Sequence, residues 1–315
     1  MSERIYVDRT TTWHAIGKSV EECKDLGSVL TASGLDYEVG KKQVFVIDDL
    51  GQPKAIPNRF VTTRLSDGHL YDVVSDKFEV VQNADAFDFV NYMGEDLQFE
   101  KAGETATGMV YIIGKLPQVD ILGDAFTPHV IFRNGFSGKV KITAAICPLR
   151  MVCQNQFNFA FNGTENTVTI RHLANAEAKL REAREILKVS ADYMDMLTKQ
   201  AQMYAQAKMS QAMFEKMVDH MFPMPTEIEL ETMNSFKRSK LESAREQFLA
   251  AYNADDNGNF RGTAWGIINA YTDYITHRVP TSGKVGTREE GKFIKTTFQQ
   301  GGMNEILNVV NMFVA

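Results

Sequence analysis

The sequence has 315 residues, of which 44% are hydrophobic and 23% charged, as expected of a globular chain long enough for one or two domains. It contains no run of about eighteen apolar residues, so no membrane span is expected, and its three cysteines argue against a disulfide framework. The net charge of −6 excludes a surface covered with phosphate-binding residues, so any binding of a polyanion would need basic residues gathered locally.

Residues 1–170 are predicted to form a β-rich part. The charged N-terminus lacks the apolar core of a signal peptide, which favours a cytoplasmic location. Two helices are predicted, at about 19–33, ending at Gly34, and at about 84–93. Short β-rich runs surround them, and the sequence Asp67–Gly68 between two of these runs is a strong hairpin signal.

Residues 171–315 are predicted to be helical. A long amphipathic helix follows residue 170, and further helices are expected near 210–221, 226–252, 260–277 and 289–313. A basic, mobile loop is expected at 278–292, because Pro280, Gly283 and Gly286 interrupt the helical pattern. The predicted fold class is therefore α+β.

No metal site or cofactor site is predicted. Cys147 and Cys153 lack the two-residue separation of a zinc knuckle, and the six histidines are scattered singly. Both cysteines are interpreted as small packed residues. Asp48 and Asp49 fall at a predicted turn, where carboxylates are common, so enzymatic activity is not expected but stays open.

The distribution of charge is more informative. Residues 125–164 contain no Asp or Glu but several basic and aromatic residues. Lys139 and Lys141 alternate with apolar residues, so a strand would place both lysines on one face. Cations beside aromatic rings suit single-stranded nucleic acid, which needs phosphate neutralisation and base stacking. The alternative is an ordinary hairpin whose solvated face is basic.

Several segments resemble a known family. "TTWHAIG", "ASGLDYEV", "CPLRMVCQNQF" and "RGTAWGIINAYTDYITHR" occur in the order seen in phage and plasmid proteins catalogued as a domain of unknown function and labelled phage/plasmid-like. The resemblance covers nearly the whole chain and implies a bacteriophage origin. It carries over Arg150, Cys153 and Asn155, whereas Gln156 stands where many members have Thr. The order of elements also looks like that of phage single-strand annealing proteins.

The favoured hypothesis is an oligomeric, phage-encoded protein of the host cytoplasm that binds or anneals single-stranded DNA in replication or recombination, without a cofactor. Basic residues would contact phosphates and the two phenylalanines would stack on bases. The candidate residues are Arg133, Lys139, Lys141, Arg150, Asn155, Phe132, Phe136, Arg278, Lys284 and Arg288. Two alternatives stay open: an interaction protein that binds a host protein and blocks a defence system, and an enzyme that processes nucleic acid through clustered carboxylates.

Overall fold

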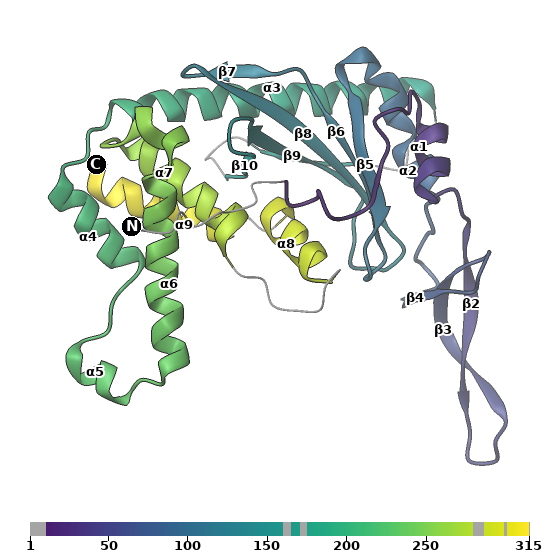
Figure 1. Cartoon of the computed structure of the whole chain (residues 1–315). Coiled ribbons are helices and arrows are strands. Elements are labelled where there is room, and N and C mark those ends of the chain that lie inside the picture. Colours follow the sequence, from purple (N-terminus) through teal and green to yellow (C-terminus); the bar gives the residue numbers. More distant parts are fainter. Residues whose placement is uncertain (1–10, 160–164, 171–174, 280–286, 299–300, 315) are drawn as a thin grey trace.

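A large antiparallel sheet organises the molecule (Figure 1). The computed structural model describes residues 11–159, 165–170, 175–279, 287–298 and 301–314. The sheet has eight strands, six of which follow the order β1-β5-β6-β8-β9-β10, with β7 paired to β8 and β11 paired to β9. Their bounds are β1 Lys18–Ser19, β5 Gln98–Glu104, β6 Met109–Lys115, β7 Val119–Ile121, β8 Asp124–Gly135, β9 Thr143–Arg150, β10 Asn155–Gln156 and β11 Thr167–Thr169.

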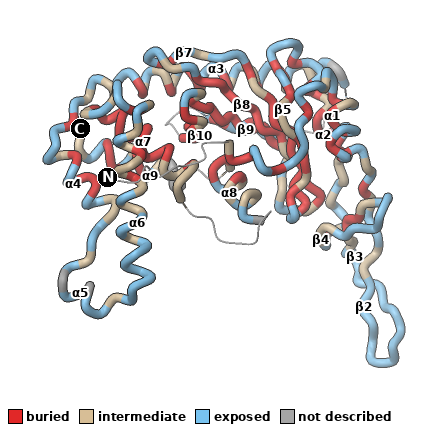
Figure 2. Tube along the Cα trace, in the orientation of Figure 1, coloured by how far each residue is buried: buried red, intermediate tan, exposed pale blue. Residues whose placement is uncertain are grey.

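A second, three-stranded sheet projects from the body (Figures 1 and 2). It consists of β2 (Val39–Ile47), β3 (Pro53–Arg64) and β4 (Leu70–Ser75). The predicted hairpin at Asp67–Gly68 is confirmed: it joins β3 to β4, and Gly68 has a φ of 76°, which favours glycine. Beyond Arg59, β3 pairs with β2 alone, so the outer part is a two-stranded ribbon. We call residues 41–59 the β arm.

An ion pair fixes the small sheet to the body. Arg64 lies 2.6 Å from Glu104 at the end of β5, and the Tyr37 hydroxyl donates to the same carboxylate at 2.9 Å. The guanidinium also lies 4.2 Å from the centre of the Tyr37 ring. These contacts join β3, β5 and the segment before β2, so the β arm extends from a braced base.

Helices make up most of the chain after residue 175. Their bounds, with those of the earlier short helices, are α1 Leu26–Ser33, α2 Asn83–Phe87, η1 Asp88–Tyr92, η2 Gly94–Asp96, α3 Ala176–Gln206, α4 Gln211–Met221, α5 Glu227–Thr232, α6 Ser235–Tyr252, η3 Asp255–Phe260, α7 Ala264–Asp273, η4 Tyr274–Arg278, α8 Thr287–Phe298 and α9 Gly301–Val314. The α+β fold class is thereby confirmed. In the part of the chain that the structure describes, no helix combines the length and apolarity that crossing a bilayer requires.

Capping residues explain where several helices begin and end. The end of α1 at Gly34 is confirmed: this residue is left-handed, with a φ of 78°. The single helix expected over 226–252 is wrong, because Asn234 interrupts it and caps α6 by accepting a hydrogen bond from the Lys237 amide. The resulting pair, α5 and the first half of α6, forms a second projection at the opposite end of the molecule from the β arm (Figure 1).

The two faces of the large sheet are covered differently. Alternate residues of β8 point to opposite sides: Val130 and Phe132 belong to a large core that also contains Ile186 of α3. Ile131 belongs to a smaller core with Trp13 and Phe293 of α8. The large core draws residues from both sides of the composition change near residue 170, so the β-rich and helical parts (1–170 and 171–315) share it.

Candidate nucleic-acid interface

The aromatic candidates, Phe132 on β8 and Phe136 directly after it, lie in the core. Phe132 faces α3 and packs against Phe89 with ring centres 5.3 Å apart. Phe136 is also buried, between Tyr37 and Tyr71. Neither ring can stack on a base while the protein is folded, so both leave the candidate site. The prediction failed because alternation in a strand shows which residues share a face, but it does not show which of the two faces the long helix covers.

Arg150 is buried as well, with an exposed fraction of 1%. Its guanidinium lies 2.6 Å from the Asp124 carboxylate and 3.6 Å from that of Asp256, and donates to the Asp256 carbonyl at 2.8 Å. The prediction that Arg150 contacts DNA phosphates is therefore wrong. Arg150 has a structural role, in which its single positive charge balances two partly buried carboxylates. The acid-free window starts one residue after Asp124, which hid this partner.

Asn155 and Arg278 are likewise internal. Asn155 lies in β10, and its amide nitrogen is 3.5 Å from the carbonyl of Asn269 in α7. Arg278 closes η4 and pairs with Asp273 at 3.2 Å, with both side chains almost fully buried. The prediction that Arg278 begins a basic loop at 278–292 is wrong, because residues 274–278 are helical and 287–292 belong to α8. Lys284 lies outside the described residues.

The two cysteines of the acid-free region lie in the interior of the protein. Cys147 on β9 and Cys153 in the following turn are buried, as the packing interpretation predicts. Burial raises the pKa of both thiols to about 12. Thiols with so high a pKa are protonated at neutral pH and are poor nucleophiles.

Lys139 and Lys141 are exposed at the surface. The expectation that they share a strand face is wrong, because β8 ends at Gly135 and β9 begins at Thr143, which leaves both lysines in the connecting turn. The Lys139 side chain is 84% exposed, and its ammonium lies 3.4 Å from Asp72 of β4. An exposed ion pair of this kind contributes little stability, so the lysine can exchange Asp72 for a phosphate at small cost.

Arg133 joins this turn to α8. It points to the face of the sheet opposite Phe132, where its Nε donates to the Thr143 hydroxyl at 2.5 Å. Its guanidinium lies 4.4 Å from the centre of the Phe298 ring, at the end of α8. Burial lowers the pKa of Arg133. This contact places the C-terminal end of α8 beside the β8–β9 connection.

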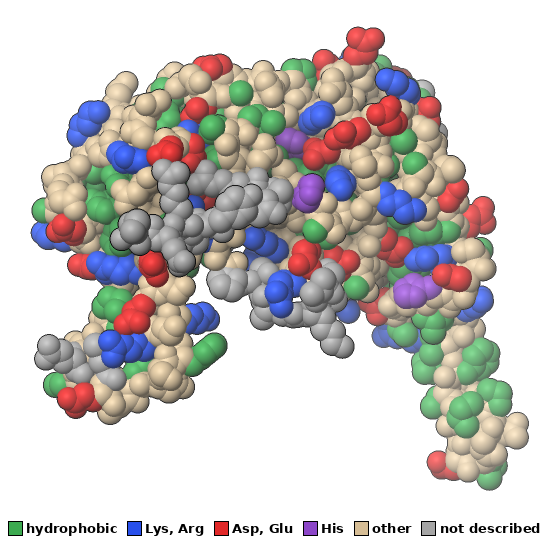
Figure 3. Space-filling model, viewed as in Figure 1, with side chains coloured by type: hydrophobic (Ala, Val, Ile, Leu, Met, Phe, Trp, Pro, Cys, Tyr) green, Lys and Arg blue, Asp and Glu red, His purple; other side chains and the backbone are tan. Residues whose placement is uncertain are grey.

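Helix α8 adds further basic side chains. Arg288 and Lys295 are exposed and stand seven residues apart, which is two helical turns, so both lie on the same face of the helix. Lys292 is half-buried, and burial lowers its pKa. In Figure 3, Lys and Arg side chains lie over α8 in the hollow between the two projections, with acidic side chains beside them. We define the α8 basic cluster as Arg133, Lys139, Lys141, Arg288, Lys292 and Lys295.

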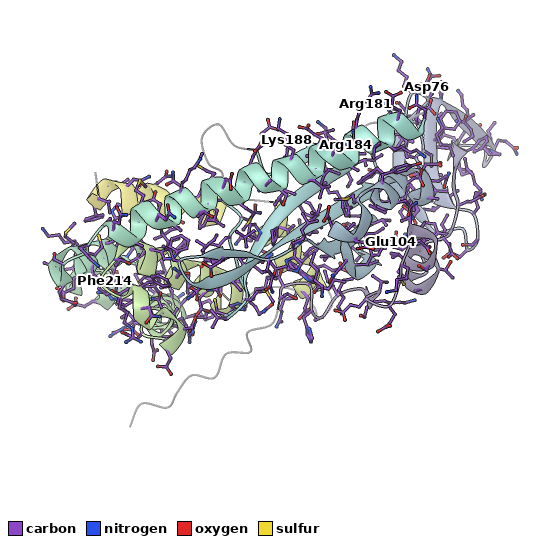
Figure 4. All side chains as sticks on the ribbon, turned by 90° about the horizontal axis from the view of Figure 1, so that it is seen from above. Asp76, Glu104, Arg181, Arg184, Lys188 and Phe214 are labelled. Atoms are coloured by element: carbon purple, nitrogen blue, oxygen red, sulfur yellow. The ribbon has the colours of Figure 1, made fainter. Side chains whose placement is uncertain are left out.

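A second row of cations lies on the other side of the sheet. Arg181, Arg184 and Lys188 follow the outer surface of α3 (Figure 4), and all three are exposed. Acidic residues alternate with them: Glu177 lies 3.9 Å from Arg181, and Glu185 is adjacent to Arg184. This mixture is typical of a solvated helix face.

A polar cluster around His129 lies on the face of the large sheet that α8 covers, and it was not anticipated from the sequence. His129 Nε2 lies 3.0 Å from Glu100, and its Nδ1 donates to the Thr127 carbonyl at 3.0 Å. The indole of Trp13 donates to the same carboxylate at 3.0 Å. Burial is the largest single influence and would raise the pKa of Glu100, but the hydrogen bond and charge of His129, the hydrogen bond from Trp13 and the charge of Lys115 together outweigh it, so this pKa lies below its usual value.

A cavity of about 490 Å³ adjoins this cluster. Glu21, Glu95, Asp96 and Lys115 line it, together with His129 and Glu100. Within the described ranges, no three His, Cys, Asp or Glu side chains converge in a way that could hold a metal ion. Because carboxylates outnumber basic side chains in the cavity lining, a phosphate chain would be repelled there and attracted at the α8 basic cluster.

Comparison with known protein families places most of the chain in one family model. A family model with the description domain of unknown function (DUF932) matches residues 70–298, which run from β4 to the end of α8. All six residues of the α8 basic cluster fall inside this range, whereas the β arm and α9 fall outside it. No curated protein and no solved structure matches the chain.

Proposed function

We propose that this chain, which belongs to the family described as domain of unknown function (DUF932), binds single-stranded DNA through the α8 basic cluster. It would do so as a self-associating protein that acts in phage replication, recombination or annealing. The sequence resemblance to phage and plasmid proteins supports the phage setting. The α8 basic cluster supports the binding of single-stranded DNA.

The observation that carries the proposal is the junction between the β8–β9 turn and α8. The turn supplies Lys139 and Lys141, and the helix supplies Arg288 and Lys295. Arg133 holds the two elements together through its contact with Phe298. The cations therefore come from two neighbouring elements, although the net charge of the chain is negative. Local concentration of this kind is what a polyanion requires.

The same geometry restricts how single-stranded DNA would be recognised. Phe132 and Phe136 are buried, and Phe298 is stacked beneath Arg133, so base stacking on these rings makes no contribution. Affinity would come mainly from contacts with phosphates, which carry no base information. The expected behaviour is binding that weakens steeply with salt and differs little between sequences.

The first test compares two charge reversals. Arg288→Glu with Lys295→Glu alters the exposed face of α8, and Arg184→Glu with Lys188→Glu makes the same change of charge on α3. Fluorescence anisotropy with a labelled single-stranded oligonucleotide at low salt measures the affinity of each variant. We expect a loss of at least about tenfold for the α8 pair and less than about threefold for the α3 pair.

The comparison controls for net charge, since both variants become more negative by the same amount. Equal losses in the two variants would mean that binding depends on overall charge, and would contradict the assignment to α8. Absence of binding by the folded wild-type protein would refute the proposal and leave a protein partner as the better hypothesis.

A further inference from the structure

The tip of the β arm exposes apolar side chains that have no partner in the described chain. Phe45 is 55% exposed, Ile47 64% and Leu50 84%. These residues lie on a two-stranded ribbon that extends away from the body (Figure 2). Isolated ribbons of two strands are only marginally stable in water, and exposed apolar strand edges attract other strands. The arm therefore has the properties of an element that is completed by another chain.

The two edges of the ribbon differ in their ability to pair. The edge formed by β3 contains Pro53 and Pro57, which lack the amide hydrogen that a strand ladder needs. The edge formed by β2 contains no proline, and among the described residues no strand pairs with it. Its central stretch, residues 41–47, can therefore accept a further strand, while β3 is protected.

The sequence of this edge is complementary to itself. Residues 41–49 read Lys-Lys-Gln-Val-Phe-Val-Ile-Asp-Asp. If two copies pair antiparallel about Phe45, Lys42 of each copy lies opposite Asp48 of the other, and Val44 lies opposite Val46. Phe45 then faces its own copy on the two-fold axis. Opposite charges and apolar pairs directly across an antiparallel ladder both stabilise it.

We propose that the β arm is a homodimerisation element, in which β2 pairs antiparallel with β2 of a second copy about Phe45. The two small sheets become one continuous sheet with the order β4-β3-β2-β2-β3-β4, in which β4 is absent from the outer ribbons. This arrangement is isologous, so it closes after two copies. Parallel self-pairing is disfavoured, because it would place Lys42 beside Lys42 and Asp48 beside Asp48.

The placement of Lys42 and Asp48 supports this register. Lys42 is exposed, whereas the neighbouring Lys41 already donates to the carbonyls of Asp76 and Phe78. One oxygen of Asp48 accepts hydrogen bonds from the amides of Leu50 and Gln52, which holds the carboxylate at the end of β2. A fixed carboxylate at the end of the strand is suited to meet a cation from the other copy.

The inference concerns self-association alone, and it does not rest on DNA binding. The β arm lies outside residues 70–298, the range of the family match. In Figure 1, the tip of the arm is far from α8, so a dimer joined there leaves the α8 basic cluster uncovered.

The first experiment measures the dimer dissociation constant by sedimentation without DNA. Lys42→Glu replaces two attractive pairs by two repulsive ones and should weaken the dimer about tenfold or more. Lys54→Glu makes the same charge change on β3 of the same arm, and should leave the constant within about twofold. Adding Asp48→Asn to Lys42→Glu removes the repulsion but keeps the oxygen that caps the turn, and should recover part of the loss.

A second experiment tests the register by disulfide formation, in a background in which Cys23 is replaced by Ser. Phe45→Cys should form a cross-linked dimer quickly under mild oxidation, because residues directly opposite have Cβ atoms about 4.5–5.5 Å apart. Leu50→Cys is a matched control: Leu50 is more exposed than Phe45, but the two copies of residue 50 would lie roughly 30 Å apart.

Three results would overturn the inference. They are a monomeric wild-type protein at tens of micromolar, a dimer that tolerates Lys42→Glu as well as Lys54→Glu, and cross-linking of Leu50→Cys as fast as that of Phe45→Cys. Because none of these assays contains DNA, their failure is distinguishable from failure of the proposed function.

Discussion

Replacing Arg150 by Gln should strongly destabilise the fold. The guanidinium contacts the Asp124 carboxylate at 2.6 and 2.8 Å, the Asp256 carboxylate at 3.6 Å and the Asp256 carbonyl at 2.8 Å. Gln is too short to keep these contacts and carries no charge, so two partly buried carboxylates lose their cation. Removing one partner from a buried ion pair typically costs about 3–5 kcal/mol.

The expected change in melting temperature follows from this energy. For a chain of this size, each kcal/mol shifts the midpoint by about 2 °C, so Arg150→Gln should lower it by roughly 6–10 °C in a calorimetric or dichroism melt. Arg288→Gln removes an exposed cation of α8 and should shift it by no more than about 1 °C. Adding Asp124→Asn to Arg150→Gln should restore part of the loss, because it removes one uncompensated charge.

A small shift for Arg150→Gln, similar to that of Arg288→Gln, would refute the argument that Arg150 is an internal counter-ion. It would also reopen its assignment to a binding surface. Unchanged oligonucleotide affinity in a destabilised but folded Arg150→Gln protein is the expected companion result, because Arg150 does not belong to the α8 basic cluster.

Two further predictions concern titratable groups. The folded pKa of Glu100 lies below its unfolded value of about 4.3, so the stability contributed by its bond to His129 is present above that pH and is lost as pH falls through the folded pKa. Glu100→Gln should therefore lose less stability than wild type between pH 6 and pH 3, in thermal melts at each pH; equal losses would contradict the pairing. Cys147 and Cys153 should react with a thiol reagent only after unfolding, whereas the half-buried Cys23 reacts in the native protein. Fast reaction of three thiols in the native state would be inconsistent with the packing.

Local signals explain which parts of the fold were predictable. The turn at Asp67–Gly68 and the helix end at Gly34 depend on backbone conformations that only a few residues favour, so a dipeptide or a single glycine was enough. The break between α5 and α6 was missed because its cause is one capping residue, Asn234, inside an otherwise helical pattern.

The candidate site was only partly predictable, because burial depends on residues distant in the sequence. The alternation of Phe132 and Arg133 was visible, but the choice of faces is made by α3 and α8, which follow much later. Arg150 could not be recognised as internal from its neighbours, since Asp256 lies 106 residues away. Lys139 and Lys141 stayed on the surface because they lie in a turn.

The salt dependence of DNA binding by the Lys139→Glu, Lys141→Glu double variant tests whether phosphates contact the α8 basic cluster. Each phosphate contact contributes about 0.7 to the slope of log affinity against log salt for single strands. We expect the variant to bind every tested sequence more weakly, with a slope flatter by about 1.4 and an unchanged melting temperature. A slope equal to that of the wild type would contradict the assignment of the binding surface to the α8 basic cluster.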